Sequence, residues 1–527
     1  MTESLGMACL RGLSRGGHRV ALIDGGMAGR EVKAGLLLGA GLALAQKIRQ
    51  EEPGPRVGVV LPPGAGGAIA NLACVLAGKT PVNLNFTSGR EAADSAARQA
   101  GLKTVITAKV MEEKLGEQFP EAGRRLDLGR MLKEEKLWAV VWSVLAWILP
   151  VGWLAWLGNV PKEGGDREAG LLFTSGSTGE PKGVVLTHDN ILANLRQIDG
   201  VLGDLQLRSV LGCLPLFHSF GFTVTLWWPL TAGPRVVTYP SPLDPHALGD
   251  VISKFSVDLL VTTPTFLRTL MRRAGKEKLG RLKMVVTGAE KLPGLLREDF
   301  EEKIGVKVYE GYGMTEGSPV VAVNRPGAER PGTVGKAVGG MEIRTVDEET
   351  GKVLPMGNPG ILEFRGPNIF PGYLGRPDLT RKVLREGWYH SADFGRVDEE
   401  GFLTIEGRRA RFSKVGGEMV PHGVVEERLM SWLKGKGIWH EGVQELMVTA
   451  VEDEKKGESL VVLHSCELEA TEAEKALREM GFPNLWIPKR FVRVKAVPIL
   501  ASGKLDLAAG RKLAQSGMTS GAVSSIG

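Results

Sequence analysis

Cysteine is scarce in this chain of 527 residues, which holds only Cys9, Cys74, Cys213 and Cys466. The four lie far apart, without the short spacings of a metal site or the framework of a disulfide-rich domain. We therefore expect four ordinary packed thiols and a reducing compartment.

The sequence also lacks a strong excess of charge. Its 66 lysine and arginine residues against 60 aspartate and glutamate residues leave a formal net charge of +6. Because this excess is diluted over a large surface, we expect no nucleic-acid partner. The N-terminus lacks the charged segment, apolar core and small-residue cleavage site of a secretory signal, so we expect a cytoplasmic protein.

Strand and helix patterns alternate from residue 56 to about 310. Short β-branched runs read RVGVVLP, KTPVNLN, KTVITA, RVVTYP, VDLLVTTP and LKMVVTG. This order predicts parallel sheets in an α/β fold, with ligand sites at the carboxyl ends of the strands. The length, with 43% apolar residues, predicts two or more domains.

Two other patterns follow. Short strands with Gly and Pro turns at about 330–406 predict antiparallel β structure. Strands around a helix near 471–480 predict a small α+β domain that starts near residue 410. The last residues, 515–527, are low in complexity, and we expect them to be disordered.

The stretch LLFTSGSTGEPKG, residues 171–183, gathers glycines, hydroxyls and a lysine in one loop. The Gly-Lys-Ser/Thr of a Walker loop is absent, because Lys182 precedes a glycine. Glycines still let backbone N–H groups converge on an anion, and hydroxyls add donors. Alone, the loop predicts either a nucleotide-phosphate site or a flexible surface turn. The candidate residues are Thr174, Ser175, Gly176, Ser177, Thr178, Gly179 and Lys182.

This loop is the first of five motifs along the chain. They read TSGSTGEPKG (174–183), GAEKL (288–292), YEGYGMTE (309–316), WYHSADFGRVDEEGFLTIEGR (388–408) and SGKLD (502–506). In order and spacing they resemble the adenylate-forming superfamily of acyl-CoA synthetases, peptide-synthetase adenylation domains and luciferases. The resemblance implies a large α/β domain over 1–408, with two doubly wound subdomains and a distorted β-barrel. It also implies a small mobile α+β domain over 409–514.

The segments LPLFHSFGFTVTLWWPLTAG (214–233) and KVGGEMVPHGVVEERL (414–429) narrow the resemblance. They are similar to the acyl-acyl carrier protein synthetase part of bifunctional 2-acylglycerophosphoethanolamine acyltransferases. The acyltransferase part of those proteins is built around His-x4-Asp, and no histidine here has an aspartate five positions on. We therefore expect the synthetase part alone.

The implied activity is an ATP-dependent ligase that converts a fatty acid, expected to be long-chain, to acyl-AMP. The acyl group would then pass to the phosphopantetheine thiol of acyl carrier protein or CoA. Two alternatives stay open. One is a ligase for another carboxylic acid, and the other is a membrane-associated lipid- or nucleotide-binding pseudoenzyme.

The resemblance also implies roles for single residues. The loop at 174–183 would hold the β- and γ-phosphates of ATP, Glu316 would bind Mg²⁺, and Thr315 would contact the α-phosphate. Lys504 would contact the α-phosphate and the carboxylate during adenylation, and His218 would gate the passage between nucleotide and acyl pocket. Taken singly, Glu316 and Lys504 would read as solvated surface charges and His218 as a packed histidine.

The nucleoside would be held by a second set of residues. Asp393 would grip both ribose hydroxyls, since a carboxylate accepts two hydrogen bonds, and Arg408 would support it. Adenine would be framed by Tyr312, Gly313, Gly288, Ala289 and Glu290. Plain core residues are the alternative for this adenine set.

The chain departs from the family pattern at two places. The family usually has Thr-Gly before the ribose aspartate, whereas this chain has Ser391 and Ala392. The family's hinge between its two domains is usually Asp or Lys, and here it is Ala410. Ala392 lacks the backbone freedom of glycine, which puts the path of that loop in question.

One apolar segment, LWAVVWSVLAWILPVGWLAWLG at 137–158, has no charge and five tryptophans. About 20 apolar residues suffice to cross a bilayer, but both flanks should belong to one folded domain and so to one side. Pro150 and Gly152 divide the segment into two pieces too short to span. We expect a monotopic contact with the cytoplasmic leaflet of the membrane; a buried helix or a dimer interface is the alternative.

Overall fold

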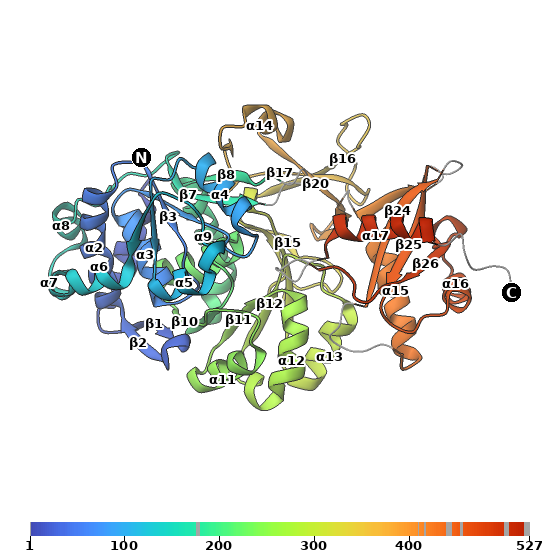
Figure 1. Ribbon diagram of the computed structural model, residues 1–527, viewed down its shortest axis with the longest axis horizontal. Helices are drawn as coiled ribbons and strands as arrows, with labels where there is room; N and C mark the ends of the chain where they lie inside the picture. Colours follow the sequence, from blue (N-terminus) through green and yellow to red (C-terminus); the bar gives the residue numbers. More distant parts are fainter. Residues whose placement is uncertain are drawn as a thin grey trace.

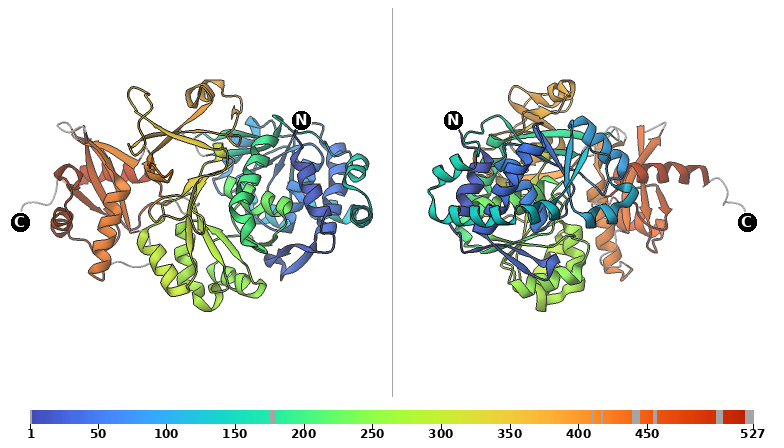
Figure 2. Two further views of the ribbon diagram at one scale, coloured as in Figure 1. Left: turned by 180° about the vertical axis from the view of Figure 1, so that it is seen from behind. Right: turned by 60° about the vertical axis from the view of Figure 1, so that its left-hand side comes forward.

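The structure, a computed structural model, describes residues 2–174, 180–408, 411–415, 418–438, 445–453, 457–499 and 505–520. A large N-terminal body and a smaller C-terminal body lie side by side along the longest axis (Figures 1 and 2). Loops and the helix α15 (His422–Gly435) approach the large body where the two meet.

The largest sheet has nine strands in the order β15-β14-β13-β12-β11-β9-β10-β1-β2. From β13 to β1 the strands run parallel, and the strands at both edges are antiparallel. Strands buried on both faces need continuous apolar runs, which these sequences supply. The strands are β1 (Val20–Asp24), β2 (Arg30–Lys33), β9 (Ser209–Gly212), β10 (Arg235–Thr238), β11 (Leu259–Thr262), β12 (Met284–Thr287), β13 (Val308–Gly313), β14 (Val320–Val323) and β15 (Lys336–Ala337).

A second, four-stranded sheet is wholly parallel, in the order β4-β3-β5-β6. Its strands are β3 (Arg56–Val59), β4 (Thr80–Asn83), β5 (Thr104–Thr107) and β6 (Arg124–Asp127). Helices connect the strands of both sheets, as βαβ units require. They include α2 (Ala34–Glu51), α3 (Ala65–Leu76), α4 (Arg90–Gln99), α9 (His188–Leu202), α11 (Pro245–Phe255), α12 (Pro264–Leu279) and α13 (Gly294–Ile304). The predicted α/β class with parallel sheets is confirmed.

Two antiparallel sheets complete the large body. One has the order β18-β8-β7, and the other has the order β16-β17-β20-β19 with β21 paired to β20. Their strands are β7 (Glu168–Thr174), β8 (Lys182–Thr187), β16 (Glu342–Val346), β17 (Gly360–Arg365), β18 (Gly372–Tyr373), β19 (Leu384–Arg385), β20 (Trp388–Val397) and β21 (Leu403–Arg408). The antiparallel structure predicted at about 330–406 is therefore present.

The small body is an α+β unit with its own apolar core around Val425, Leu429 and Val462. Its sheet has the order β23-β22-β25-β24 with β26 paired to β25. The strands are β22 (Phe412–Val415), β23 (Glu418–Pro421), β24 (Leu446–Asp453), β25 (Gly457–His464) and β26 (Arg490–Arg493). Besides α15, its helices are α16 (Ala470–Glu479) and α17 (Leu507–Ser520).

The helix α17 corrects one prediction. We expected disorder from residue 515, but the helix continues through Ser520. It packs against β24 and β25, and Ala514 is buried in that contact. Apolar burial on one face therefore carries the helix past the point where the composition turns polar. Residues 521–527 lie outside the described residues.

Candidate active site

The predicted phosphate loop connects β7 to β8 in an antiparallel hairpin. Thr174 and Lys182 are the last register partners of the two strands on the side of the loop. Residues 175–179 lie outside the described residues. On the other edge of β8, Tyr373 of β18 pairs with Val184, and the Lys182 ammonium lies 5.8 Å from the centre of the Tyr373 ring.

Tyr373 also binds the carboxylate predicted to hold Mg²⁺. Its hydroxyl donates a hydrogen bond of 2.8 Å to Glu316 Oε1. Burial, followed by the negative charge of Glu316, holds the pKa of Tyr373 far above its usual value, so the hydroxyl stays a donor. Lys182 and Glu316, 134 positions apart in sequence, thus meet at the same tyrosine.

Thr315 lies beside the segment that carries His218. Its hydroxyl is 3.3 Å from that of Ser219. The His218 side chain is exposed, with its ring edge-on to Phe217 at 4.8 Å between centres. A π-helix, η4 (Phe220–Trp227), begins two residues later, and such turns often occur at functional sites. The structure therefore brings Thr315, Glu316 and the His218 segment together.

The predicted ribose aspartate is Asp393 on β20, and it is buried. The Tyr312 hydroxyl donates a hydrogen bond to its Oδ2 atom. The Tyr312 ring stacks on Phe364, with 5.7 Å between centres. Across the sheet, Asp393 is the register partner of Arg408 on β21, whose side chain lies outside the description.

Ser391 and Ala392, where the chain departs from the family pattern, lie within β20, where its register with β17 shifts between His390 and Phe394. The Ser391 hydroxyl donates to the Leu362 carbonyl at 2.8 Å and accepts the Asp393 N–H at 3.1 Å. Ala392 does not have a positive φ, so it needs none of the freedom of glycine. The path of this strand is compatible with alanine.

The predicted adenine segment follows β12 directly. A side chain at Gly288 would place its Cβ 3.4 Å from the Phe220 ring, and Ala289 adopts a left-handed φ of 69°. Glu290 Oε2 accepts a 2.7 Å hydrogen bond from the Thr265 hydroxyl. At Gly313, on the neighbouring β13, a Cβ would lie 2.3 Å from the Pro319 carbonyl oxygen, so glycine alone fits there.

Lys504 and Ala410 lie outside the described residues, so the structure gives no contact for the predicted catalytic lysine or hinge. All other predicted residues with described side chains gather around the carboxyl ends of β12 and β13. One arm of this cluster holds Lys182, Thr315 and Glu316, and the other holds Tyr312 and Asp393. The cation and hydroxyls of the first arm suit a chain of anionic groups. The carboxylate of the second arm suits a diol joined to that chain.

Sequence reasoning missed the residues that hold the loop after Glu316. On α9, Asn194 exchanges two hydrogen bonds with the backbone of Val320, at 2.8 and 3.1 Å. Its neighbour Gln197 donates to Asn368, which in turn donates to the Gly317 carbonyl at 2.6 Å. All three side chains are buried. Single buried amides within an amphipathic helix give no sequence signal beyond an interrupted apolar face.

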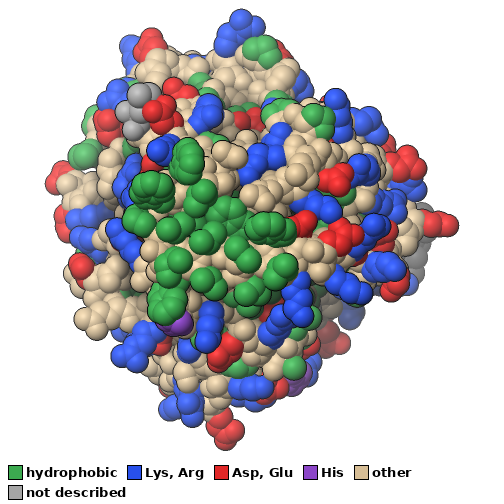
Figure 3. All heavy atoms as spheres, turned by 90° about the vertical axis from the view of Figure 1, so that its left-hand side faces the viewer, with side chains coloured by type: hydrophobic (Ala, Val, Ile, Leu, Met, Phe, Trp, Pro, Cys, Tyr) green, Lys and Arg blue, Asp and Glu red, His purple; other side chains and the backbone are tan. Residues whose placement is uncertain are grey.

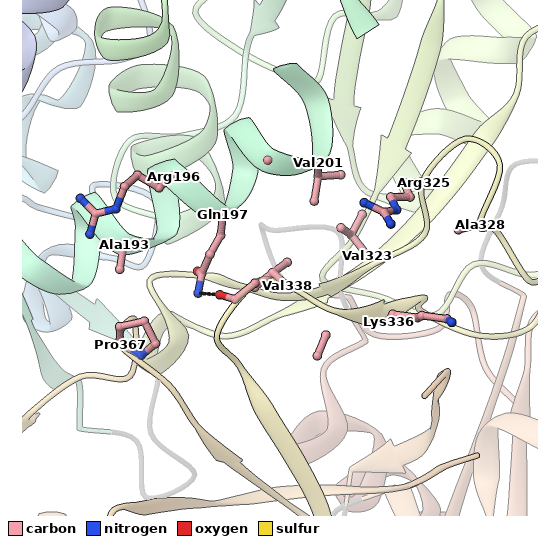
Figure 4. A pocket seen from close by; sticks show the side chains of 13 residues that line it. Ala193, Arg196, Gln197, Val201, Val323, Arg325, Ala328, Lys336, Val338 and Pro367 are labelled. Carbon is pink, nitrogen blue, oxygen red and sulfur yellow. Dashed lines mark hydrogen bonds between the residues drawn. The ribbon is translucent and has the colours of Figure 1, made fainter. Parts of the chain in front are cut away.

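A groove of about 560 Å³ opens between α9, β14 and β15 on the far side of this network (Figure 4). The Gln197 side chain points into it and donates to the Gly339 carbonyl at 2.7 Å. Arg196, Arg325 and Lys336 stand around an apolar floor, and no predicted site residue lines it. The groove is therefore separate from the cluster at β12 and β13.

No group of three or more His, Cys, Asp or Glu side chains capable of holding a metal occurs among the described residues. Glu316 nevertheless fits Mg²⁺, because Oε1 is fixed by Tyr373 while Oε2 has no hydrogen-bond partner in the described part of the chain. Mg²⁺ is usually held by one or two carboxylates, substrate phosphates and water.

Comparison with solved structures assigns the fold. The chain resembles ATP-bound MatB from Rhodopseudomonas palustris with a TM-score of 0.80 and 25% identity, covering 94% of this chain and 95% of that one. It resembles o-succinylbenzoate CoA synthetase from Bacillus subtilis, in complex with its acyl-adenylate intermediate, with a TM-score of 0.79 and 25% identity. That alignment covers 96% of this chain and 97% of the other. The fold is that of the adenylate-forming enzymes.

Residues 30–374 match the family model of the AMP-binding enzymes, and the chain belongs to this family. A curated relative is the long-chain-fatty-acid–CoA ligase of Bacillus subtilis (strain 168), 32% identical over 356 residues. The alignment covers 66% of this chain but 62% of that ligase, less than two thirds of its length.

Proposed function

We propose that the protein is an ATP-dependent acid–thiol ligase that activates a long-chain fatty acid as acyl-AMP and transfers it to a phosphopantetheine thiol. The observation that carries this proposal is the cluster at the ends of β12 and β13. It combines the Lys182 and Glu316 arm with the Tyr312 and Asp393 arm. The name of the curated relative supports a fatty acid as the substrate.

ATP would lie with its phosphates at the β7–β8 hairpin and its ribose at Asp393. A fatty-acid carboxylate oxygen attacks the α-phosphorus, the new P–O bond forms, and the bond from this phosphorus to the oxygen bridging to the β-phosphate breaks. Pyrophosphate leaves with that oxygen. This step concentrates negative charge at the phosphates. Lys182, the Thr315 hydroxyl and the N–H groups of the loop are suited to stabilise that charge.

Mg²⁺ would be held by Glu316, and when bound it neutralises charge on the phosphates. Tyr373 orients the Glu316 carboxylate toward that task from a buried position. The second step is attack of the thiol sulfur on the acyl carbon, which forms the thioester and releases AMP. CoA is the acceptor that the relatives' names support, and acyl carrier protein is the acceptor that the closer resemblance suggests.

We propose that residues 1–408 and 409–514 act as two domains that rotate about Ala410. Rotation would bring Lys504 to the nucleotide for the first step and the 414–420 hairpin to the thiol tunnel for the second. Both bodies have cores of their own, which supports independent movement.

The test is pyrophosphate release from ATP and Mg²⁺ with fatty acids of increasing chain length, with CoA or holo acyl carrier protein as acceptor. We expect turnover with long-chain acids, loss of turnover in Lys504→Ala, and loss of affinity for ATP in Asp393→Asn. Turnover with other carboxylic acids alone would redirect the proposal to another acid. Binding of ATP without turnover for any acid would contradict the ligase.

We also propose that the enzyme works at the inner face of the cytoplasmic membrane, which residues 137–158 contact. None of the described helices is long and apolar enough to cross a membrane.

A further inference from the structure

The apolar segment forms two helices, α7 (Lys136–Ile148) and α8 (Val151–Leu157), with the break at Pro150. One face of the pair is packed on the protein. Ala139, Trp142 and Ala146 of α7 and Leu154 and Ala155 of α8 are buried. In Figure 1 the two helices lie at the end of the large body farthest from the C-terminal domain.

The contact between α7 and α2 is close and leaves no room for rearrangement. A Cβ on Gly39 of α2 would lie 2.2 Å from the Ala139 carbonyl oxygen and 2.8 Å from the Ser143 N–H nitrogen. Gly158, after α8, is similarly close to Leu42 of α2. The inner face of α7 therefore packs on α2, that of α8 packs on α1 (Leu5–Ser14), and the fold does not bury the outer face.

That outer face is strongly apolar. The exposed fractions are 54% for Trp138, 65% for Trp147, 62% for Trp153 and 65% for Trp156. Other exposed apolar residues here are Leu137, Val140, Val144, Ile148 and Leu157. Figure 3 shows these helices' hydrophobic side chains as one continuous patch with lysine and arginine on several sides. A patch of this kind marks an interaction site, because leaving it in water is unfavourable.

The chemistry of the patch favours a lipid surface over a second copy of the chain. Indole rings concentrate at the level of lipid headgroups, where an apolar ring and a polar N–H are both satisfied. Lys133, Lys136 and Lys162 flank the helices, are exposed, and have no ion pair among the described residues. A two-fold dimer through this patch would bring these cations toward one another, whereas anionic headgroups would neutralise them.

We propose that the outer face of α7 and α8, with its four exposed tryptophans and flanking lysines, docks flat on the surface of an anionic phospholipid bilayer. The contact is shallow, because the inner faces of α7 and α8 stay packed on α2 and α1 and the helix axes must remain in the plane of the membrane. For an enzyme of the proposed function, on which this clause alone rests, docking would bring the chain to the membrane that holds its fatty-acid substrate.

The experiment is co-sedimentation of the full chain with two kinds of vesicle, phosphatidylcholine alone and phosphatidylcholine mixed with phosphatidylglycerol. We expect binding to the anionic vesicles that weakens with salt. A variant of the four exposed rings should lower the bound-to-free ratio by about tenfold or more while leaving the thermal unfolding transition unchanged. The substitutions are Trp138→Gln, Trp147→Gln, Trp153→Gln and Trp156→Gln.

The matched control is a variant with Leu243→Gln and Met356→Gln, which changes exposed apolar side chains outside the patch and should bind vesicles as the native chain does. Vesicle binding does not require catalysis, so failure of the ligase would leave this test intact. The proposal is overturned if the native chain ignores anionic vesicles, or if the four-tryptophan variant binds them equally well. It is also overturned if the native chain is a dimer that this variant converts to monomers.

Discussion

At the scale of single residues, Tyr373 connects the parts of the proposed phosphate site. Its ring faces the Lys182 ammonium, and its hydroxyl holds Glu316. Burial raises the pKa of Tyr373 and keeps its hydroxyl protonated. The hydroxyl can therefore donate to the Glu316 carboxylate at neutral and at basic pH. A metal-binding carboxylate needs such a second partner, because an unsupported side chain samples several rotamers.

The first prediction concerns that hydrogen bond. In Tyr373→Phe the ring remains but Glu316 loses its donor, and a hydrogen bond to a charged group contributes about 1.5–3 kcal/mol. We expect kcat/KM for ATP to fall by about tenfold or more, with a higher Mg²⁺ requirement, measured by pyrophosphate release at varied Mg²⁺. Tyr239→Phe, which removes an exposed hydroxyl bonded to Asp244, is the control and should change nothing. Equal Mg²⁺ dependence in the two variants would contradict the role of Tyr373.

Sequence reasoning was most informative for residues inside contiguous motifs. Thr315, Glu316 and Asp393 were predicted because their neighbours identify them, and the structure shows them in one cluster. Tyr373 belongs to GPNIFPGYL (366–374), a segment in which the sequence predicted no site residue. Its role depends on β18 pairing with β8, a contact between residues almost 190 positions apart that no local pattern encodes.

At the scale of elements, α9 acts as a scaffold for the loop that follows Thr315 and Glu316. It follows β8 directly, begins with a capping box at Thr187 and Asn190, and presents amides along one face. Asn190 holds the backbone of Pro367 and Ile369, while Asn194 holds that of Val320. The segment after Glu316 and the segment before Tyr373 are therefore both held by one helix.

The second prediction removes the central amide of this network. Asn194→Ala leaves the N–H of Val320 and the side-chain oxygen of Gln197 without this partner, while the Val320 carbonyl keeps its hydrogen bond from Asn368. Buried polar groups without partners cost about 1–3 kcal/mol each, so we expect a loss of about 2–4 kcal/mol in unfolding free energy. We also expect kcat to fall more than the affinity for ATP. Denaturant titration and steady-state kinetics measure the two effects.

The control for this prediction is Arg196→Ala. Arg196 is exposed on the same helix, so its removal should change stability by no more than about 0.5 kcal/mol. An Asn194→Ala variant as stable and active as Arg196→Ala would show that the network does not position the loop.

The strands that sequence predicted best are the buried parallel ones. The runs VDLLVTTP and LKMVVTG are mainly apolar, because every residue of β11 and β12 is buried. The hairpin of β1 and β2 was missed, since VALID before Gly25 and Gly26 was not interpreted as a strand and the partner strand alternates in polarity. The end of α17 was misplaced because its support comes from β24, far away in sequence.

At the scale of the whole molecule, two buried histidines couple stability to pH. Burial lowers the pKa of His188 from 6.5 to about 4 and that of His422 to about 3. His188 accepts the Leu5 N–H at Nδ1, 2.9 Å away, and therefore must be unprotonated there. Glu310 opposes them, because its burial raises the pKa of its carboxyl to about 7.

The third prediction follows from the sign of these shifts. Below pH 6.5 the unfolded chain takes up a proton that folded His188 refuses, so stability falls as pH falls toward 4. Between pH 7.5 and 5, His188 alone should cost about 2 kcal/mol. His188→Gln removes the cost of keeping His188 unprotonated. The difference in unfolding free energy between variant and native chain should therefore change by about 2 kcal/mol from pH 7.5 to pH 5, in favour of the variant. Urea titrations at both pH values measure it.

His246→Gln serves as the control for the pH experiment, because it replaces an exposed histidine of α11. Its stability gap to the native chain should be the same at both pH values. A His188→Gln gap that does not move with pH would mean that His188 is protonated in the folded protein.

The two bodies of the molecule meet through ion pairs that are partly exposed. Lys291 lies 3.1 Å from Glu427, and Lys434 lies 3.0 Å from Asp299, which ties α15 to α13 and the loop before it. Such pairs contribute about 0–1 kcal/mol each and weaken with salt. The two pairs therefore favour the observed arrangement of the bodies by a small free energy, which a change of arrangement can overcome.

The fourth prediction tests this arrangement. Glu427→Gln combined with Asp299→Asn should change the unfolding free energy by less than about 1 kcal/mol. It should, however, broaden the distribution of distances between fluorescent labels placed on the two bodies, because two ion pairs between them are lost. Raising salt should broaden the native distribution in the same way. Glu342→Gln removes an exposed pair with Arg365 inside the large body and should leave the distances unchanged. If the double variant keeps the native distance distribution, the two bodies are joined by more than these pairs, and rotation between half-reactions would need another trigger.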